Sequence, residues 1–360
     1  MASTSPLGSV LIVGTGLIGT SIGLSLRRAG IEVLLDDLIP GQAIVARELG
    51  AGDLLHEGAR PDLVVVSVPP RHAAETIARV SREFPGAVIT DVTSVKTAVL
   101  RDARALGADP ARLVGGHPMA GREVSGATAA RVDLLDDRLW IVTPMDATSD
   151  SVAQVARLIS ACGAYLVEMT PEEHDRAVAL VSHAPQLLSS VLAAELVQAD
   201  DAYVRVAGQG LRDMTRIAAS DDQLWADILS TNAGPVSEVL DSLIERLTAA
   251  RASLSSDDSG SDASAISTVL RNGAEGQRRI PGKHGGTASA YESVAVMLAD
   301  SPGELARLFA AAGDEGINTE DVRIEHILGR PSGLVEVFVS PDRGEALRSA
   351  LRARGFDVRA

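Results

Sequence analysis

Short apolar runs alternate with amphipathic segments along the first half of the chain. Each run is followed by a polar loop that contains glycine or proline, a pattern typical of buried strands in a parallel sheet. The pattern predicts seven strands, at residues 9–13, 31–35, 63–67, 87–91, 113–116, 139–143 and 164–168. We therefore expect an α/β domain over residues 1–169.

From Thr170 onward the apolar positions recur with the period of a helix. Leu180, Ala184, Leu187 and Val191 form one apolar stripe, and Pro235 begins a last long helix. A helical block whose apolar faces are left over commonly pairs with its own copy. The pattern therefore predicts an all-helical domain over residues 170–252 that forms a homodimer.

The last third of the chain changes character twice. Residues 253–264 are rich in serine and aspartate, and residues 277–286 are locally basic. We interpret residues 253–289 as a linker with a basic loop, which is either an ordered flap beside the substrate or a tether. From residue 290 to residue 360 the order of elements is βαββαβ, which predicts a small ferredoxin-like domain.

A nucleotide-binding fingerprint joins the first two strands. The first strand runs into Gly14-Thr15-Gly16-Leu17-Ile18-Gly19, and the second ends at Asp36-Asp37. In this Rossmann pattern the glycines let the backbone reach a pyrophosphate, and the acid accepts a hydrogen bond from a ribose hydroxyl. Such an acid repels a 2′-phosphate, which favours NAD over NADP. The expected cofactor contacts are Gly14, Gly16, Leu17, Ile18, Gly19, Asp36, Asp37, Ser67 and Pro69, with Asp37 preferred over Asp36 for the ribose.

A histidine framed by glycines follows the fifth predicted strand. His117 comes after Gly115 and Gly116, and backbone that approaches a ligand closely favours residues without a side chain. The loops that carry His117 and Ser94 are expected at the carboxyl ends of their strands, where open parallel sheets bind ligands. Lys96, two residues beyond Ser94, is either a solvated residue at a helix start or a ligand contact.

The helical region carries further polar candidates. His183 and Gln186 are three residues apart and share a face that borders the apolar stripe, where they either reach a ligand or pack. His174, nine residues before His183, is expected on the opposite face. Arg212 and Arg216 lie one turn apart, as on a solvated face or around a dicarboxylate.

Composition limits the classes of function. The net charge of -15 argues against a nucleic-acid partner. The single cysteine excludes an internal disulfide and fits a reducing cytoplasm. The sequence offers no signal peptide, no apolar run long enough to span a membrane, and no cluster with metal-ligand spacing. We expect a soluble cytoplasmic protein without a metal.

The motif series resembles that of the prephenate and arogenate dehydrogenases, enzymes of tyrosine biosynthesis. The resemblance runs from about residue 9 to residue 250 and rests on residues 14–19, 91–96, 115–126, 182–186 and 213–216 together with Trp225. It implies NAD-dependent oxidative decarboxylation of prephenate to 4-hydroxyphenylpyruvate, with arogenate as the alternative substrate.

The resemblance also implies roles for individual residues. His117 would be the catalytic histidine, Ser94 would assist it, and Arg216 would hold the ring carboxylate of the substrate. The implied substrate contacts are Arg122, Glu123, His183, Gln186, Arg212, Asp213 and Trp225. Gln186 stands where relatives often have a second histidine, and Arg122 replaces a smaller polar residue, so the choice between a keto acid and its amino analogue stays open.

The small C-terminal domain resembles an ACT regulatory domain. This resemblance rests on residues 300–305 and 316–318. It implies that tyrosine binds there and inhibits the enzyme, with Asp300, Pro302, Gly303, Ile317 and Asn318 as contacts. A module that only dimerises is the alternative.

Two other classes of protein share parts of this pattern. A dehydrogenase of 3-hydroxy acids would carry a catalytic lysine on its first long helix, and residues 170–198 contain no lysine. A non-catalytic sensor of NAD or amino acids would not need His117, Ser94 and Arg216 together.

Overall fold

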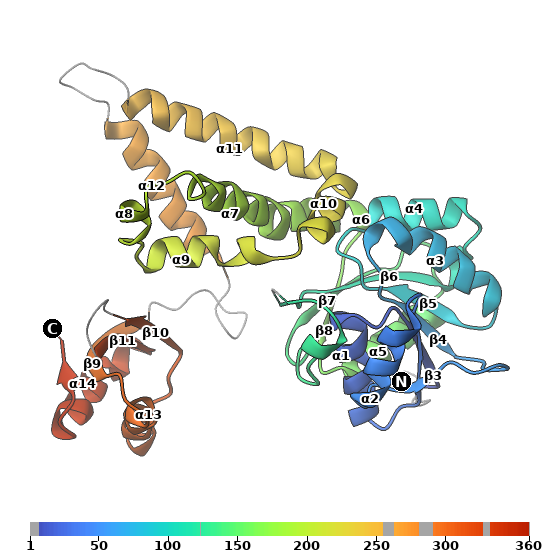
Figure 1. Ribbon diagram of the computed structural model, residues 1–360, viewed down its shortest axis with the longest axis horizontal. Coiled ribbons are helices and arrows are strands. Elements are labelled where there is room, and N and C mark those ends of the chain that lie inside the picture. Colours follow the sequence, from blue (N-terminus) through green and yellow to red (C-terminus); the bar gives the residue numbers. More distant parts are fainter. Residues whose placement is uncertain (1–6, 123, 255–262, 281–290, 327–331, 360) are drawn as a thin grey trace. The chain divides into compact units, whose positions relative to one another are not determined.

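The computed structural model describes residues 7–122, 124–254, 263–280, 291–326 and 332–359. The chain divides into two compact units, residues 1–244 and 245–360, with the division inside a long helix (Figure 1). The first unit contains the predicted α/β domain and the first part of the helical domain. Each unit is described by itself.

An eight-stranded sheet forms the centre of the first unit, in the order β3-β2-β1-β4-β5-β6-β7-β8. Its strands are β1 (Val10–Val13), β2 (Val33–Asp36), β3 (Asp53–Leu54), β4 (Leu63–Val66), β5 (Val88–Asp91), β6 (Leu113–Pro118), β7 (Leu139–Thr143) and β8 (Tyr165–Glu168). The prediction of a wholly parallel sheet is wrong at one point. Strands β1 to β6 are parallel, but β7 pairs antiparallel with β6, with His117 opposite Ile141, and β8 follows β7.

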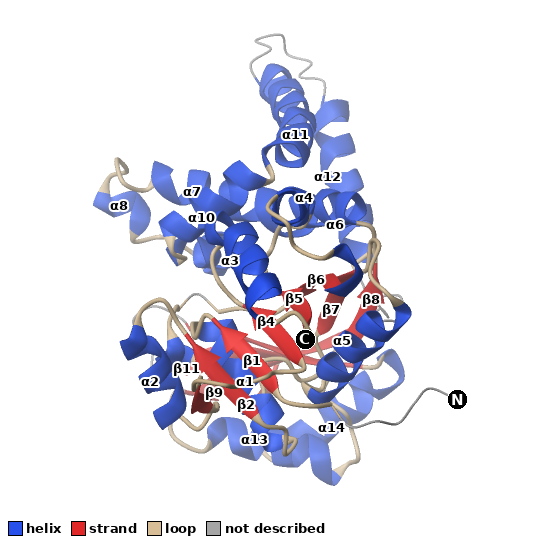
Figure 2. Cartoon of the chain, turned by 90° about the vertical axis from the view of Figure 1, so that its right-hand side faces the viewer, coloured by secondary structure: helices blue, strands red, loops and turns tan. Residues whose placement is uncertain are grey.

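Helices cover both faces of this sheet (Figure 2). They are α1 (Leu17–Arg28), α2 (Pro40–Glu48), α3 (Pro70–Glu83), α4 (Thr97–Ala105) and α5 (Ser149–Ala161). Alternate residues of β1 serve the two faces: Val10 and Ile12 pack in one buried cluster, while Leu11 and Val13 pack in the other. Each fully buried aliphatic side chain contributes about 1.5–3 kcal/mol to folding, so packing on both faces stabilises the position of the strand.

The helical region that follows is built from α6 (Pro171–Val178), α7 (Ala184–Glu195), α8 (Asp201–Val204), α9 (Gln209–Thr215), α10 (Asp222–Thr231) and α11 (Ala233–Leu254). Thr170 caps α6 in a capping box with Glu173, as its sequence indicates. A π-helical turn, Ala179–His183, joins α6 to α7. Arg71 of α3 forms an ion pair with Asp227 of α10, which ties this region to the sheet domain.

Residues 171–195 form the one described stretch that is long and apolar enough to cross a membrane by length and composition. Buried helices of proteins without a membrane segment meet the same criterion. Here His174, Asp175 and Gln186 are buried and hydrogen-bonded within the protein. These polar contacts hold one side of the stretch within this unit, while Leu180 and Val191 on the same stretch are exposed.

The second unit contains a four-stranded antiparallel sheet in the order β10-β11-β9-β12. Its elements are β9 (Glu292–Ala299), α13 (Glu304–Asp314), β10 (Asp321–His326), β11 (Ser332–Val339), α14 (Gly344–Ala353) and β12 (Asp357–Val358). Residues 263–278 form helix α12, inside the segment that was interpreted as a linker. Ile266, Val269 and Leu270 have helical spacing, but they are too few for the pattern to indicate a helix.

Candidate active site

The glycine-rich turn after β1 has the geometry that a dinucleotide needs. Gly14 has φ +98°, and a Cβ built on it would lie 2.2 Å from the carbonyl oxygen of Ser67. A Cβ on Gly19 would lie 2.0 Å from the carbonyl oxygen of Gly14. Gly16 caps α1 and has no atom within 4 Å of its Cβ position. Gly14 and Gly19 therefore close the turn. Gly16 leaves open space at the N-terminus of α1, where a pyrophosphate fits.

The two acids at the end of β2 have different surroundings. Asp37 accepts hydrogen bonds from the backbone nitrogen of Thr15 at 2.7 Å and from its hydroxyl at 2.9 Å. Asp36 instead lies 3.5 Å from a guanidinium nitrogen of Arg79. The carboxylate of Asp37 therefore lies next to the glycine turn, while Asp36 faces Arg79 of α3.

The remaining predicted cofactor contacts lie around the same turn. Leu17 and Ile18 begin α1, and Ser67 follows β4 and donates a backbone hydrogen bond to Val13 at 2.7 Å. Pro69 precedes α3 as its N-cap. Because β4 is the neighbour of β1 in the sheet, these residues extend the same edge.

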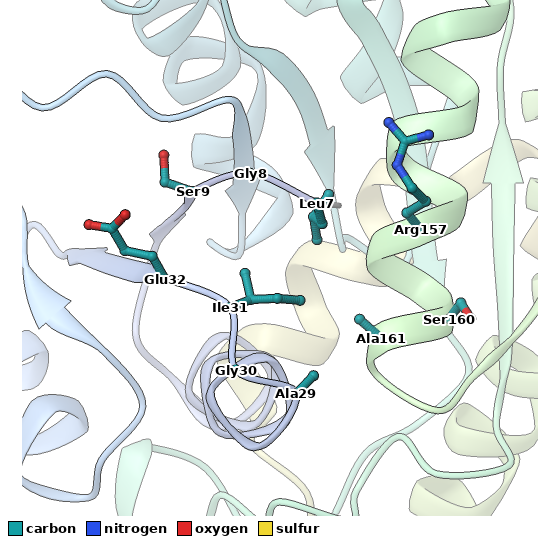
Figure 3. Close-up of a pocket in the computed structure, with 10 residues that line it drawn as sticks. All are labelled: Leu7, Gly8, Ser9, Ala29, Gly30, Ile31, Glu32, Arg157, Ser160 and Ala161. Carbon is teal, nitrogen blue, oxygen red and sulfur yellow. The ribbon is translucent and has the colours of Figure 1, made fainter. Parts of the chain in front are cut away.

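A separate open pocket of about 630 Å³ lies at the other end of the strands (Figure 3). It is lined by residues that precede β1 and β2, including Ser9 and Glu32, and by Arg157 of α5. Parallel sheets bind nucleotides at the carboxyl ends of their strands. This pocket is therefore distinct from the glycine turn.

His117 lies on strand β6, which continues two residues beyond its predicted end at Gly116. The glycines before it have a packing role. A Cβ on Gly115 would lie 2.2 Å from the Thr143 hydroxyl, and one on Gly116 would lie 2.7 Å from the carbonyl oxygen of Asp91. The interpretation that these glycines admit a ligand is wrong, because neighbouring strands fill the space.

A second histidine, His174, contacts His117, although regular helical spacing predicts His174 on the face opposite His183. The Nδ1 atom of His117 is 2.9 Å from the Nε2 atom of His174, and the ring centroids are 5.1 Å apart. The Nδ1 atom of His174 is in turn 2.8 Å from the carboxylate of Asp175. The structure therefore joins three polar side chains from β6 and α6.

The π-helical turn accounts for this difference. Nine residues of regular helix, at about 100° per residue, would put His174 and His183 on opposite sides. A π turn holds one extra residue, so the pair is separated by roughly 80° instead. Both side chains are fully buried. No pattern of apolar residues predicts a π turn, so helical spacing alone cannot predict the contact between His174 and His117.

A buried ion pair, Lys96 with Asp91, lies near His117 and His174. Lys96 is fully buried and pairs with Asp91, and it donates a hydrogen bond to the Thr93 hydroxyl at 2.8 Å. Asp91 also accepts a hydrogen bond from the backbone nitrogen of Gly116 at 3.2 Å. Lys96 is therefore neither solvated nor free for a ligand. Burial lowers its pKa, opposed by the attraction of Asp91.

His183 is held by Asn232, an asparagine 49 residues further along the chain. The Nδ2 atom of Asn232 is 2.9 Å from the backbone carbonyl of Asp175 and 3.0 Å from Nδ1 of His183. Since a carbonyl only accepts, Nδ2 is the donor to both atoms, and Nδ1 of His183 carries no proton. The proton of neutral His183 is then on Nε2, which is buried without a partner among the described residues.

Burial keeps these histidines neutral. Desolvation lowers the pKa of His117 well below its ordinary value, with further lowering by His174, Lys96 and His183. Desolvation also lowers the pKa of His174, against the opposing effect of Asp175. The pKa of His183 is lowered to about 4, again mainly by burial. A neutral imidazole can accept a proton, which is what a general base does.

Gln186, Trp225, Arg212 and Arg216 are the other predicted substrate residues of the helical region. Gln186 is buried and donates a hydrogen bond to the carbonyl oxygen of Ile217 at 2.9 Å, which ties α7 to the turn that begins at Arg216. The ring of Trp225 lies 6.1 Å from the ring of His183. Arg216 and Arg212 are both exposed.

The remaining predicted contacts are less directly tied to these side chains. Asp213 is exposed and accepts a hydrogen bond from Gln209 at 2.7 Å. Arg122 donates to the carbonyl oxygen of Ala129 at 2.9 Å. Glu123 lies outside the described residues. Ser94 is half-buried, three residues beyond the end of β5, the strand that pairs with β6.

Two family models match the chain. The model of the nucleotide-binding domain of prephenate dehydrogenase matches residues 22–168, and the model of its dimerization domain matches residues 170–266. Residues 267–360 lie outside both matches.

Individual relatives agree with the family models. The protein named "Probable prephenate dehydrogenase NovF" from Streptomyces niveus is 36% identical over 354 residues, which is 96% of this chain and 98% of that protein. The prephenate dehydrogenase of Bacillus subtilis (strain 168) is 28% identical and is covered over 96% of its length. The crystal structure of A. aeolicus prephenate dehydrogenase with hydroxyphenyl propionate and NAD+ has a TM-score of 0.68 at 27% identity, over 76% of this chain and 99% of that one.

Proposed function

The chain belongs to the prephenate dehydrogenase family, and we propose that it catalyses the NAD-dependent oxidative decarboxylation of prephenate to 4-hydroxyphenylpyruvate. The observation that carries this proposal is a neutral histidine on the same sheet as the glycine turn. The order β2-β1-β4-β5-β6 lines up Asp37, the glycine turn, Ser67, Ser94 and His117 from strand to strand. An extended dinucleotide along this edge would have its ribose at Asp37 and its nicotinamide toward His117.

NAD, when bound, supplies the acceptor for the hydride that leaves the ring carbon bearing the hydroxyl. His117 accepts the hydroxyl proton, and Ser94, from the neighbouring strand, assists by orienting the same hydroxyl. Arg216 holds the ring carboxylate, which leaves as carbon dioxide when the carbonyl forms. Arg216 should grip the carboxylate without over-stabilising it, because equal binding of ground state and transition state does not raise turnover.

Neutral donors and cations suit the remaining parts of the substrate. The Nε2 proton of His183 is available for an acceptor, and Trp225 borders it. Gln186 holds the turn of Arg216, and Arg212, Asp213, Arg122 and Glu123 are the outer contacts of the proposed site. We choose prephenate over arogenate because the relatives from Streptomyces niveus and Bacillus subtilis, each covered over 96% or more of its length, are named for it.

The test is the reduction of NAD by purified protein with prephenate or arogenate, followed by absorbance. Reduction with prephenate at higher kcat/KM supports the proposal. Preference for arogenate would replace the substrate, and no reduction with either would refute the function. The lack of activity would leave a sensor of NAD or amino acids as the alternative.

We propose further that the protein is a cytoplasmic homodimer assembled through its helical region. The stripe side chains Leu180 and Val191 are 62% and 54% exposed within one chain. Other exposed apolar side chains of the region are Val181, Val197, Tyr203, Val206, Met214 and Ile244. Exposed apolar side chains in such number are typical of a protein–protein interface. The family model that matches residues 170–266 describes a dimerization domain. Light scattering should give twice the mass of one chain.

The C-terminal unit supports a proposal of regulation by tyrosine. Its element order βαββαβ, with a four-stranded antiparallel sheet, supports the proposal of a ferredoxin-like ACT domain. A pocket of about 350 Å³ is lined by Asp300, Pro302 and Gly303, and Gly303 has φ +94°. Ile317, however, is buried in the core of this unit, and Asn318 donates to Glu320 at 2.8 Å, so neither lines that pocket.

Regulation is tested by tyrosine inhibition of wild type and Asp300→Ala, with Asp342→Ala as a control outside the pocket. Weaker inhibition of Asp300→Ala alone supports binding at this pocket. Equal inhibition of all three proteins would instead place tyrosine in the active site as a product analogue.

A further inference from the structure

We propose that Asp175 and His174 are positioning residues that fix the tautomer of His117, so that its Nε2 atom is the proton acceptor. The proposal rests on the function proposed above, in which His117 is the general base. It assigns a role to two residues that lie outside the motifs on which the family resemblance rests.

The direction of each hydrogen bond follows from the acceptor at the end of the chain. The carboxylate of Asp175 accepts hydrogen bonds from the backbone nitrogens of Lys96 at 2.8 Å and Thr97 at 2.9 Å. A carboxylate held by two N–H groups is ionised and cannot rotate, so it also accepts from Nδ1 of His174 at 2.8 Å.

The proton on Nδ1 of His174 determines the next bond. In neutral His174 the Nε2 atom has no proton and acts as an acceptor. It therefore takes the hydrogen bond from Nδ1 of His117, at 2.9 Å. His117 is left with a proton on Nδ1 and a lone pair on Nε2, which is the form that can take a proton from the substrate hydroxyl.

The charged groups around His174 support its neutral form. Lys96 faces it from the start of α4, Asp91 from β5, Asp175 from its own helix, and His117 from β6. The burial of His174 and the cation of Lys96 oppose protonation, and these effects together outweigh the two acids, so the pKa of His174 is lowered. A doubly protonated His174 would instead donate to Nδ1 of His117. The proton of neutral His117 would then be on Nε2, which would have no lone pair for the substrate proton.

The proton balance of the step is simple. The substrate O–H bond breaks, its proton forms an N–H bond at Nε2 of His117, and the hydride goes to NAD. His117 then carries a positive charge, and its Nδ1 proton strengthens the hydrogen bond to His174. Asp175 offsets this charge through His174, as an aspartate does for a catalytic histidine in hydrolases.

The tautomer can be measured without activity. The chain has seven histidines, so ¹⁵N-histidine labelling gives few signals, and His117→Asn identifies those of His117. We expect the proton of His117 on Nδ1 in wild type and a shift toward Nε2–H in His174→Leu. His56→Gln, which changes an exposed histidine, should leave the signals of His117 unchanged. A proton on Nε2 of His117 in wild type would overturn the proposal.

Kinetics separate this role from a purely structural one. His174→Leu should lower kcat about 100-fold with little change in KM for prephenate, and His174→Gln, whose carbonyl can accept from His117, should recover part of the loss. An equal loss of kcat in both variants, with an unchanged tautomer of His117, would refute the positioning role of His174 and Asp175. Inactive wild type with the Nδ1–H tautomer would refute the function alone, so the two failures are distinguishable.

Discussion

Asn232 and His183 are joined by a hydrogen bond of 3.0 Å that decides which nitrogen of the histidine carries a proton. Because Asn232 donates, the Nε2 proton of His183 points to no protein acceptor among the described residues. A buried donor without a partner costs about 1–3 kcal/mol, a cost that a bound substrate can remove. We therefore read His183 as a donor kept for the substrate.

The first prediction concerns this pair. Asn232→Leu should raise KM for prephenate about tenfold, because His183 is free to adopt the other tautomer, and should lower the free energy of unfolding by about 1–3 kcal/mol. Steady-state kinetics and urea unfolding measure the two effects. Asn318→Ala, in the small C-terminal domain, is the matched control. An unchanged KM in Asn232→Leu would contradict the role of His183.

The second prediction concerns the base. His117→Asn should lower kcat by about 100-fold or more, the usual loss when a general base is removed. NAD affinity, measured by fluorescence titration, should stay within about twofold, because the cofactor contacts lie on β1, β2 and β4. A variant that retains full activity would rule out His117 as the base.

The third prediction concerns cofactor choice. Asp37→Ser should raise the ratio of kcat/KM for NADP to that for NAD, because a carboxylate no longer repels the 2′-phosphate. Asp36→Asn is the matched control, since Asp36 faces Arg79. If Asp36→Asn changes the ratio more than Asp37→Ser, the ribose contact belongs to Asp36.

The fourth prediction concerns the carboxylate of the substrate. Arg216→Ala should raise KM for prephenate at least tenfold, because a charge-assisted hydrogen bond is worth about 1.5–3 kcal/mol. Arg212→Ala, one turn away and exposed, should have a smaller effect. An unchanged KM in Arg216→Ala would exclude its assigned contact.

The fifth prediction concerns pH and stability. The pKa of His183 is about 4 in the folded protein, below the ordinary value of 6.5, and those of His117 and His174 are lowered in the same direction. The unfolded chain therefore binds more protons than the folded chain in this window, so stability is present above pH 6.5 and falls as the pH drops toward 4. The shifted pKa of His183 alone should lower the free energy of unfolding by about 2 kcal/mol between pH 7 and pH 5. Urea unfolding at several pH values, with His183→Asn for comparison, measures the slope, and a flat profile would contradict the buried neutral state.

The sequence predicted those parts of the fold that repeat a strong period. Strand β7 lies at its predicted residues, and β1, β4 and β5 lie within one residue at each end, because continuous apolar runs leave few alternatives. The antiparallel direction of β7 was not predictable, since direction depends on the connection rather than on the strand itself. Helix α12 was missed because its apolar residues are few.

The candidate site divides in the same way. Gly14, Asp37 and His117 belong to local motifs, so their sequence neighbours identify them. His174 and Asn232 become part of the site only through a π turn and through contacts between distant segments. Asp175 lies 78 residues from Thr97, whose backbone nitrogen it binds. No local pattern reports such a contact.

The position of Asp175 also sets an order of events during synthesis on the ribosome. The residues that form the glycine turn and bear His117 are made first, and they belong to a sheet that can begin to fold when β6 is complete. The carboxylate that orders the backbone at the start of α4 arrives only with α6, after β7 and β8. A nascent chain that ends before His174 therefore lacks both the carboxylate that binds the start of α4 and the partner of His117. We expect the growing polypeptide to acquire affinity for a nucleotide before it acquires a correctly oriented base. Incomplete chains should therefore bind a nucleotide without catalysing the reaction.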